Sequence, residues 1–134
     1  MMAMGAGSEN STTAFGQIKT TQTQAVATIS YADTEAAVRS YFEDIPVMIQ
    51  VARCESTFRH ALADGSVLTG FVDNRDTGVM QINTFYHQAV ADELGFNLLD
   101  LNDNMAYARY LYEREGVQPW NASRPCWGQT LAAL

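Results

Sequence analysis

The chain of 134 residues is poor in basic residues and has no long apolar run. It has eight Lys and Arg residues, Lys19 being the one lysine, against fifteen Asp and Glu, for a net charge of −7. This balance argues against nucleic acid as a partner, because phosphate binding needs clusters of basic side chains. No run of roughly eighteen apolar residues is present, so we expect no membrane span. The amino end, MMAMGAGS, has no charged leader or apolar segment, so we expect no signal peptide there.

Cysteine is also scarce. Cys54 and Cys126 either form a disulfide or are two buried thiols, and their spacing alone does not decide between these. A bond closing a loop of this length would stabilise the fold by about 4 kcal/mol in the chain-entropy model, and it would indicate an oxidising compartment. His60, His87 and Cys54 form no pair with the spacing of metal ligands, so we expect neither a metal nor another cofactor.

The first 30 residues differ in composition from the rest. They are rich in Ser, Thr, Gln, Ala and Gly and have no sustained hydrophobic period, so we interpret 1–30 as a flexible leader or linker. Residues 31–134 then make one domain, a length that suits a single hydrophobic core.

Two helices are predicted at the start of this domain. Asp33 or Thr34 can cap a helix that runs through Phe42. Asp44 is a plausible cap for the next helix, which runs from residue 46 to about residue 56 and is mostly apolar. Its proline stands in the first turn, where the missing N–H has no cost.

The remaining segments predict two more helices and, before them, a lobe whose composition is not helical. Helical periodicity marks TFYHQAVADELG, which Gly95 ends, and LNDNMAYARYLYEREG, which starts near Asp100 and is closed by Gly116. Between His60 and Asn83, several glycines indicate loops around short strands such as SVLTGFV and GVMQIN. The tail VQPWNASRPCWGQTLAAL should wrap back over the helices. The fold class is therefore mainly α, with a small strand or loop lobe inserted after the second helix.

Glu55 stands at the end of the apolar helix, in VARCESTFRH. The partial negative charge of a helix C-terminus and apolar neighbours such as Phe58 both raise the pKa of a carboxyl group above its ordinary value of about 4.3. A carboxylic acid that is still protonated near neutral pH is what a general acid requires. The alternative is a surface glutamate that merely ends a helix, and this stretch alone favours that alternative.

Three segments in order, CESTFRH, DTGVMQIN and NMAYARYLY, together resemble the lysozyme-like superfamily of peptidoglycan glycosidases. In that group a Glu-Ser-x-Phe at a helix end faces a Gly-x-Met/Leu-Gln-Ile segment across a saccharide cleft. The third segment is similar to a helix of the soluble lytic transglycosylases, with Ala108 where that group often has glycine. The resemblance implies an α+β lysozyme-like fold with the lobe after the catalytic helix, and it favours a disulfide between Cys54 and Cys126.

The resemblance also implies roles for the matching residues. Glu55 takes the place of the catalytic acid, which protonates the glycosidic oxygen and then serves as a base. Tyr107 would lie near its carboxyl group, although Tyr107 and Met80 can also be plain core residues. The residues expected to bind or orient the substrate are Ser56, Met80, Gln81, Asn83 and Tyr107.

Asp76, in DTGVMQIN, bears on the choice between two chemistries. Chicken-type lysozymes have an aspartate at this position, and a second carboxylate facing Glu55 makes a retaining hydrolysis possible. In lytic transglycosylases the position is commonly small, because the acetamido group of the substrate assists. Asp76 can alternatively make an Asx turn before Gly78, and Asp64 and Asp73 are weaker candidates for the second carboxylate. Since NMAYARYLY and PWNASRPCW are closer to the transglycosylase branch, we favour the non-hydrolytic route.

The expected function is thus cleavage of the bond between N-acetylmuramic acid and N-acetylglucosamine in peptidoglycan, by an extracytoplasmic monomer. A lytic transglycosylase would leave 1,6-anhydro-muramic ends, whereas a true lysozyme would use Asp76 and water. A non-catalytic glycan-binding or assembly module and a chitinase are the alternatives from other classes. The acidic charge departs from the basic lysozymes and suits an enzyme held near the cell wall, or a phage or secretion-machine component.

Overall fold

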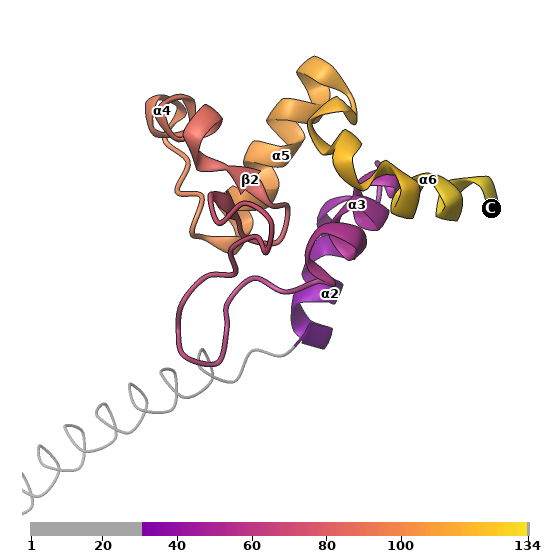
Figure 1. Ribbon diagram of the computed structural model, residues 1–134, viewed down its shortest axis with the longest axis horizontal. Coiled ribbons are helices and arrows are strands. Elements are labelled where there is room, and N and C mark those ends of the chain that lie inside the picture. The colour runs from indigo at the N-terminus through magenta and orange to yellow at the C-terminus, as the bar shows by residue number, and fades with distance from the viewer. Residues whose placement is uncertain (1–30, 134) are drawn as a thin grey trace, which may run out of the picture.

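The computed structural model describes residues 31–133, so the predicted leader, 1–30, lies outside the described residues. The elements in chain order are α2 (Tyr31–Tyr41), α3 (Pro46–Ser56), β1 (Asp76–Thr77), β2 (Ile82–Asn83), α4 (Thr84–Leu94), α5 (Leu101–Glu115), the 3₁₀ segment η1 (Gln118–Ser123) and α6 (Arg124–Ala133). The described part is mainly helical, with one two-stranded sheet between α3 and α4 (Figure 1). This confirms the predicted mainly α class with a small inserted lobe.

The helix α3 begins at Pro46 and ends at Ser56, as predicted. Pro46 occupies the first turn, where the missing N–H leaves no partner unsatisfied. The predicted cap, however, was wrong. The N-cap residue is Ile45, whose side chain has no hydrogen-bonding atom. The neighbouring Asp44 carboxylate instead accepts hydrogen bonds from both terminal nitrogens of Arg109, each at 2.9 Å.

The helix α2 packs against α3 and starts earlier than predicted. Asp33 and Thr34 lie inside this helix, which already includes Tyr31, so neither is its cap. Asp33 stands in the first turn, where a negative charge interacts favourably with the helix dipole. Val38 and Phe42 are fully buried in the core beside α3.

The lobe between α3 and α4 contains less strand than predicted. SVLTGFV contributes only to isolated bridges, which pair residues 61 with 67 and 69 with 77. The first four residues of GVMQIN form the turn that joins β1 to β2. In the short hairpin Asp76 pairs with Asn83, and directly opposite residues of an antiparallel pair share one face.

The helices α4 and α5 have the predicted ends. The side chain of Asn83 caps α4 by accepting a hydrogen bond from the Phe85 N–H, and Gly95 ends it with a left-handed backbone, φ +84°. Asp100 caps α5 and Gly116 ends it. These signals are local in the chain, which is why the sequence predicts them well.

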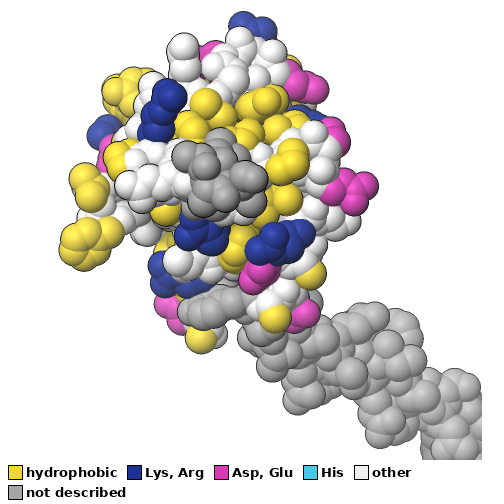
Figure 2. Space-filling model, turned by 90° about the vertical axis from the view of Figure 1, so that its right-hand side faces the viewer, with side chains coloured by type: hydrophobic (Ala, Val, Ile, Leu, Met, Phe, Trp, Pro, Cys, Tyr) yellow, Lys and Arg dark blue, Asp and Glu magenta, His cyan; other side chains and the backbone are white. Residues whose placement is uncertain are grey.

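The tail folds back over the start of the domain, as expected. Both η1 and α6 contact α3, and a disulfide joins Cys54 of α3 to Cys126 of α6, which confirms the pairing. Trp120 and Trp127 bring their rings into the core. Seen from the α6 side, hydrophobic side chains gather on this face, with basic and acidic side chains around them (Figure 2).

Over residues 31–133, no helix is long and apolar enough to span a bilayer.

One hydrophobic core underlies all these elements. The largest fully buried apolar side chains are Tyr107, Phe42, Met48, Met80, Ile82, Leu98, Met105, Val38, Val51 and Val79. They come from α2 and the residue after it, α3, the hairpin with its turn, α5 and the loop before it, so the core fixes the lobe against α3.

Candidate active site

A cleft of about 500 Å³ opens where the end of α3, the hairpin, the start of α4, the end of α5 and η1 meet. Its lining residues are Glu55, Asp76, Gln81, Ile82, Asn83, Tyr86, His87, Leu111, Glu115, Gln118, Pro119, Trp120, Asn121 and Ala122. Carboxylates, amides and aromatic rings dominate this set, and it contains no Lys or Arg. Such a lining suits a neutral, hydroxyl-rich ligand better than an anionic one.

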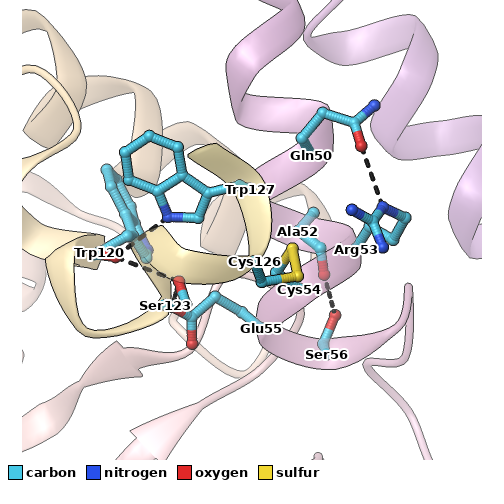
Figure 3. Close-up of a disulfide and its surroundings, with 10 residues drawn as sticks. All are labelled: Gln50, Ala52, Arg53, Cys54, Glu55, Ser56, Trp120, Ser123, Cys126 and Trp127. Atoms are coloured by element: carbon cyan, nitrogen blue, oxygen red, sulfur yellow. Dashed lines mark hydrogen bonds between the residues drawn. A yellow bond between two sulfur atoms is a disulfide. The ribbon is translucent and has the colours of Figure 1, made fainter. Parts of the chain in front are cut away.

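Glu55 lies in the last turn of α3 and is half-buried in the cleft wall. Its Oε2 accepts a hydrogen bond of 2.6 Å from the Ser123 hydroxyl (Figure 3). Burial raises the pKa of Glu55 above its usual value; the bond from Ser123 lowers this pKa, and the negative charge of Asp76 raises it. The net direction is upward, so the sequence-based expectation of a raised pKa has burial as its main cause.

The backbone turns sharply directly after this carboxyl group. Thr57 and Phe58 both have left-handed conformations, with φ +50° and +59°, which are uncommon for residues other than glycine. The N–H of Thr57 still bonds to the Arg53 carbonyl and closes the helix. The helix α3 therefore ends one residue after Glu55, which keeps this carboxyl group in the last turn of the helix.

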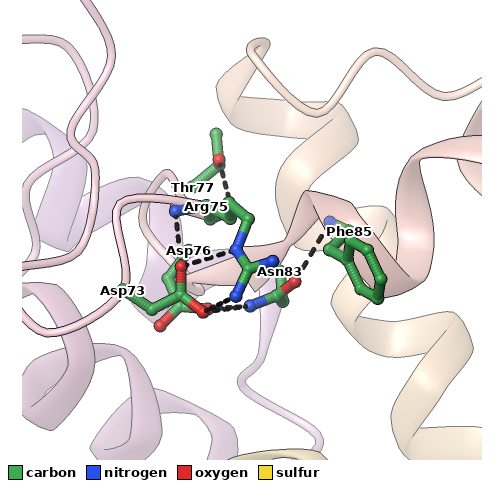
Figure 4. A network of polar contacts seen from close by, with 6 residues as sticks. All are labelled: Asp73, Arg75, Asp76, Thr77, Asn83 and Phe85. Carbon is green, nitrogen blue, oxygen red and sulfur yellow. Dashed lines mark hydrogen bonds and ion pairs between the residues drawn. The ribbon is translucent and has the colours of Figure 1, made fainter.

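Asp76 lies on β1 and lines the same cleft. Its Oδ1 accepts a hydrogen bond of 2.9 Å from the Asn83 amide, which also donates to Asp73 at 3.1 Å (Figure 4). The Asx turn in this loop is made by Asp73, whose Oδ1 accepts the Arg75 N–H. Asp76 is instead a strand residue whose charge acts on Glu55.

The two weaker acidic candidates lie elsewhere. Asp73 forms an ion pair with Arg75 at 2.9 Å, and this guanidinium holds the pKa of Asp73 well below its usual range. Asp64 accepts hydrogen bonds from the backbone and hydroxyl of Ser66. Neither residue lines the cleft.

The turn between β1 and β2 brings Gln81 to the cleft. Gln81 has a left-handed backbone, φ +52°, and its side-chain amide donates to the Gly78 carbonyl at 2.9 Å. Gly78 has φ +77°, and a Cβ there would lie 2.5 Å from Asn104 Nδ2 and 2.7 Å from His60 Cε1. Only glycine fits that position without displacing its neighbours.

Two buried side chains hold this turn from behind. Asn104 is fully buried; it accepts the Met80 N–H and donates to the carbonyls of Thr77 and Leu98. His60 accepts the N–H of residue 79 at Nδ1 and bonds through Nε2 to the carbonyl of residue 99. These partners require a neutral ring protonated at Nε2, and burial lowers the pKa of His60 accordingly. His60 is thus a structural residue.

The structure brings together four of the predicted site residues, Glu55, Asp76, Gln81 and Asn83, around one cleft. The other three, Ser56, Met80 and Tyr107, do not line it.

Each of those three side chains is buried and held from within the fold. The Ser56 hydroxyl donates to the Ala52 carbonyl. Met80 reaches the site only through its backbone, whose carbonyl accepts the Trp120 ring N–H at 2.8 Å. The Tyr107 hydroxyl lies 3.0 Å from His87 Nδ1, so Tyr107 acts on the cleft through a histidine and not directly.

The tail supplies cleft residues that sequence reasoning missed. Ser123 donates to Glu55, and Gln118 and Asn121 of η1 line the cleft; Glu115, at the end of α5, is a further lining residue that was missed. One signal was available: a Cys54–Cys126 bond puts the residues just before Cys126 beside those just after Cys54. Among residues 31–133, no group of three or more His, Cys, Asp or Glu side chains is placed to hold a metal ion.

No protein-family model, curated protein or solved structure matches this chain, so the comparisons assign it to no family.

Proposed function

We propose that the protein is a glycosidase that cleaves peptidoglycan strands between N-acetylmuramic acid and N-acetylglucosamine, with Glu55 as general acid and then base. The observation that carries this proposal is Glu55 itself: a half-buried carboxyl group with a raised pKa, in the wall of a cleft without basic residues. A raised pKa is what a carboxyl group needs in order to keep a proton that it can deliver to a leaving oxygen.

The chemistry proceeds in two steps. Protonated Glu55 donates its proton to the glycosidic oxygen as the bond from that oxygen to muramic C1 breaks. The resulting Glu55 carboxylate then removes a proton from the group that attacks C1. If this group is the muramic 6-hydroxyl, the product has a 1,6-anhydro ring; if it is water, the product has a reducing end. We favour the first route, on the resemblance of the third segment and the tail to lytic transglycosylases.

One observation favours the second candidate, a true lysozyme. Asp76 lines the same cleft as Glu55 and its charge raises the pKa of Glu55, and a retaining hydrolase uses a second carboxylate in the same cleft as its acid. Its hydrogen bond from Asn83 fixes the direction of one carboxylate oxygen. Mass spectrometry of the muropeptides released from purified peptidoglycan separates the routes, because anhydro ends are lighter by one water.

Two substitutions test the residues. Glu55→Gln keeps the shape of the side chain and removes the proton, so cleavage should be lost while the protein stays folded; exposed Glu43→Gln is the matched control. Asp76→Asn should cost a hydrolase several orders of magnitude in kcat and a transglycosylase far less. Retained cleavage by Glu55→Gln would refute the general-acid assignment.

The disulfide supports an extracytoplasmic location, because such bonds persist in oxidising compartments. A non-catalytic glycan-binding module would bind peptidoglycan fragments and release no muropeptides. A chitinase would cut chitin oligomers as readily as peptidoglycan. The same digestion experiment, run on both polymers, distinguishes these alternatives.

A further inference from the structure

The Ser123 hydroxyl group that contacts Glu55 has a second acceptor within hydrogen-bonding distance. The Ser123 Oγ lies 2.6 Å from Glu55 Oε2 and 3.1 Å from the Trp120 carbonyl oxygen. A hydroxyl group has one proton to donate and can accept at the same time. It therefore has two arrangements here: its proton points either to Glu55 Oε2 or to the Trp120 carbonyl.

When Glu55 is ionised, the Ser123 proton points to its carboxylate. When Glu55 is protonated at Oε2, this proton can be donated to Ser123 Oγ, whose own proton then turns to the Trp120 carbonyl. A proton on Oε1 instead leaves the bond from Ser123 to Oε2 unchanged and stays free for transfer. Neither arrangement requires a heavy atom to move, so Ser123 can follow the carboxyl group through donation and recovery of its proton.

The carbonyl that completes this chain is itself held in place. The Trp120 ring is buried and donates its N–H to the Met80 carbonyl at 2.8 Å. The ring N–H of Trp127 donates to the Trp120 carbonyl at 3.2 Å. These two bonds tie η1 to the hairpin and to α6, so the second partner of the Ser123 hydroxyl does not depend on a mobile group.

A covalent bond fixes the same two segments next to the contact. Cys54 is adjacent to Glu55 in α3, and Cys126 follows Ser123 by three residues (Figure 3). The disulfide and the Ser123–Glu55 hydrogen bond are thus two links between the end of α3 and the junction of η1 with α6. Such a frame keeps the hydroxyl within bonding distance when substrate enters.

We propose that Ser123 is the positioning residue of Glu55: it holds the acid in one orientation while the carboxyl group loses and regains its proton. This inference rests on the proposed role of Glu55 as acid and base. Ser123 does not touch the reacting atoms. It acts through Glu55, and its removal would leave the proton donor misaligned.

Other titratable groups face the same cleft and form the electrostatic surroundings of Glu55. They are Asp76 on β1, Tyr86 and His87 on α4, and Glu115 at the end of α5. On the tail, Arg124 follows Ser123, and its guanidinium lies over the Trp127 ring at 5.7 Å. The hydrogen bond from Ser123 lowers the pKa of Glu55, so removing it should raise that pKa further.

The test compares Ser123→Ala with Ser123→Thr, which keeps a hydroxyl group, and with Ser40→Ala, an exposed serine of α2. Two readouts are needed: the pH profile of kcat/KM on peptidoglycan, and the titration of the ¹³C-labelled Glu55 carboxyl group by NMR. Ser123→Ala should move the alkaline limb and the NMR titration to higher pH and lower kcat roughly ten- to hundredfold. Ser123→Thr should restore both, and Ser40→Ala should match the parent protein.

The two readouts separate the failure of this inference from the failure of the proposed function. An unmoved Glu55 titration in folded Ser123→Ala overturns the inference, whatever the activity. A titration that moves while kcat stays at the parent value also overturns it, because the hydroxyl would then affect charge without positioning the acid. Activity retained in Glu55→Gln overturns the proposed function instead, and the inference with it.

Discussion

The buried amide of Asn104 carries a large share of the lobe's stability, and Asn104→Ala measures it. Asn104 is 0% exposed and makes three hydrogen bonds of 2.9 to 3.0 Å to backbone groups of Met80, Thr77 and Leu98. Alanine removes the amide that serves all three backbone groups at once, at a position that is closed to solvent in the native protein.

The magnitude follows from the groups left behind. Each buried N–H or carbonyl that loses its partner costs about 1 to 3 kcal/mol, so the three groups together cost roughly 3 to 9 kcal/mol before any relaxation. A domain of this size has about 5 to 15 kcal/mol in total. With a urea slope of about 1 to 2 kcal/mol/M, the midpoint should fall by roughly 1.5 M or more.

The assay is urea unfolding followed by the fluorescence of the buried rings of Trp120 and Trp127. Asn102→Ala is the control, because Asn102 is exposed on the same helix, α5, and should change stability by under about 1 kcal/mol. If Asn104→Ala loses under about 1 kcal/mol with an unchanged slope, the amide does not support the turn and this reasoning is refuted.

Three further predictions concern the same fold. Reducing the Cys54–Cys126 bond, which closes 72 residues, should remove about 4 kcal/mol and lower Tm by more than roughly 10 °C; an unchanged Tm in calorimetry counts against a stabilising bond. The pKa of His60 is lowered by burial, so the unfolded chain binds a proton more readily; stability should fall as pH drops below about 6.5, and His60→Gln should flatten that slope in urea titrations. Gly78→Ala should destabilise by several kcal/mol, since its Cβ would lie 2.5 Å from Asn104, whereas Gly65→Ala, with open space around it, should cost only the strain of its backbone; equal losses would show that the close contact is relieved elsewhere.

The helices were predictable where their signals are local. Pro46 marks the start of α3, and Asp100 with Gly116 bounds α5, all within a few residues of the feature they determine. The Asp44 cap failed because its partner, Arg109, lies 65 residues away in the chain. Local pattern cannot show that a carboxylate is already engaged by a distant guanidinium.

The site residues that lie in short sequence motifs were predictable, and those brought in by long-range contacts were not. Glu55 and Asp76 lie in two such motifs, and the fold brings both to one cleft. Tyr107 was expected beside Glu55 but is 1% exposed, because the rotation of α5 about its axis turns that residue into the core. Ser123 has no motif of its own, and its contact depends on how the tail folds back over α3.

The disulfide and the Ser123 contact together set the order in which the site can be completed. A ribosome makes α3 long before the tail, since Glu55 and Ser123 are 68 residues apart in the chain. During synthesis, the nascent chain therefore contains Glu55 before it contains the Ser123 hydroxyl that donates to it, and before Cys126 is present to pair with Cys54. A product truncated before η1 lacks Ser123, Trp120 and Cys126 altogether. The surroundings of Glu55 are therefore complete only after η1 and α6 have been made and Cys54 has been oxidised together with Cys126.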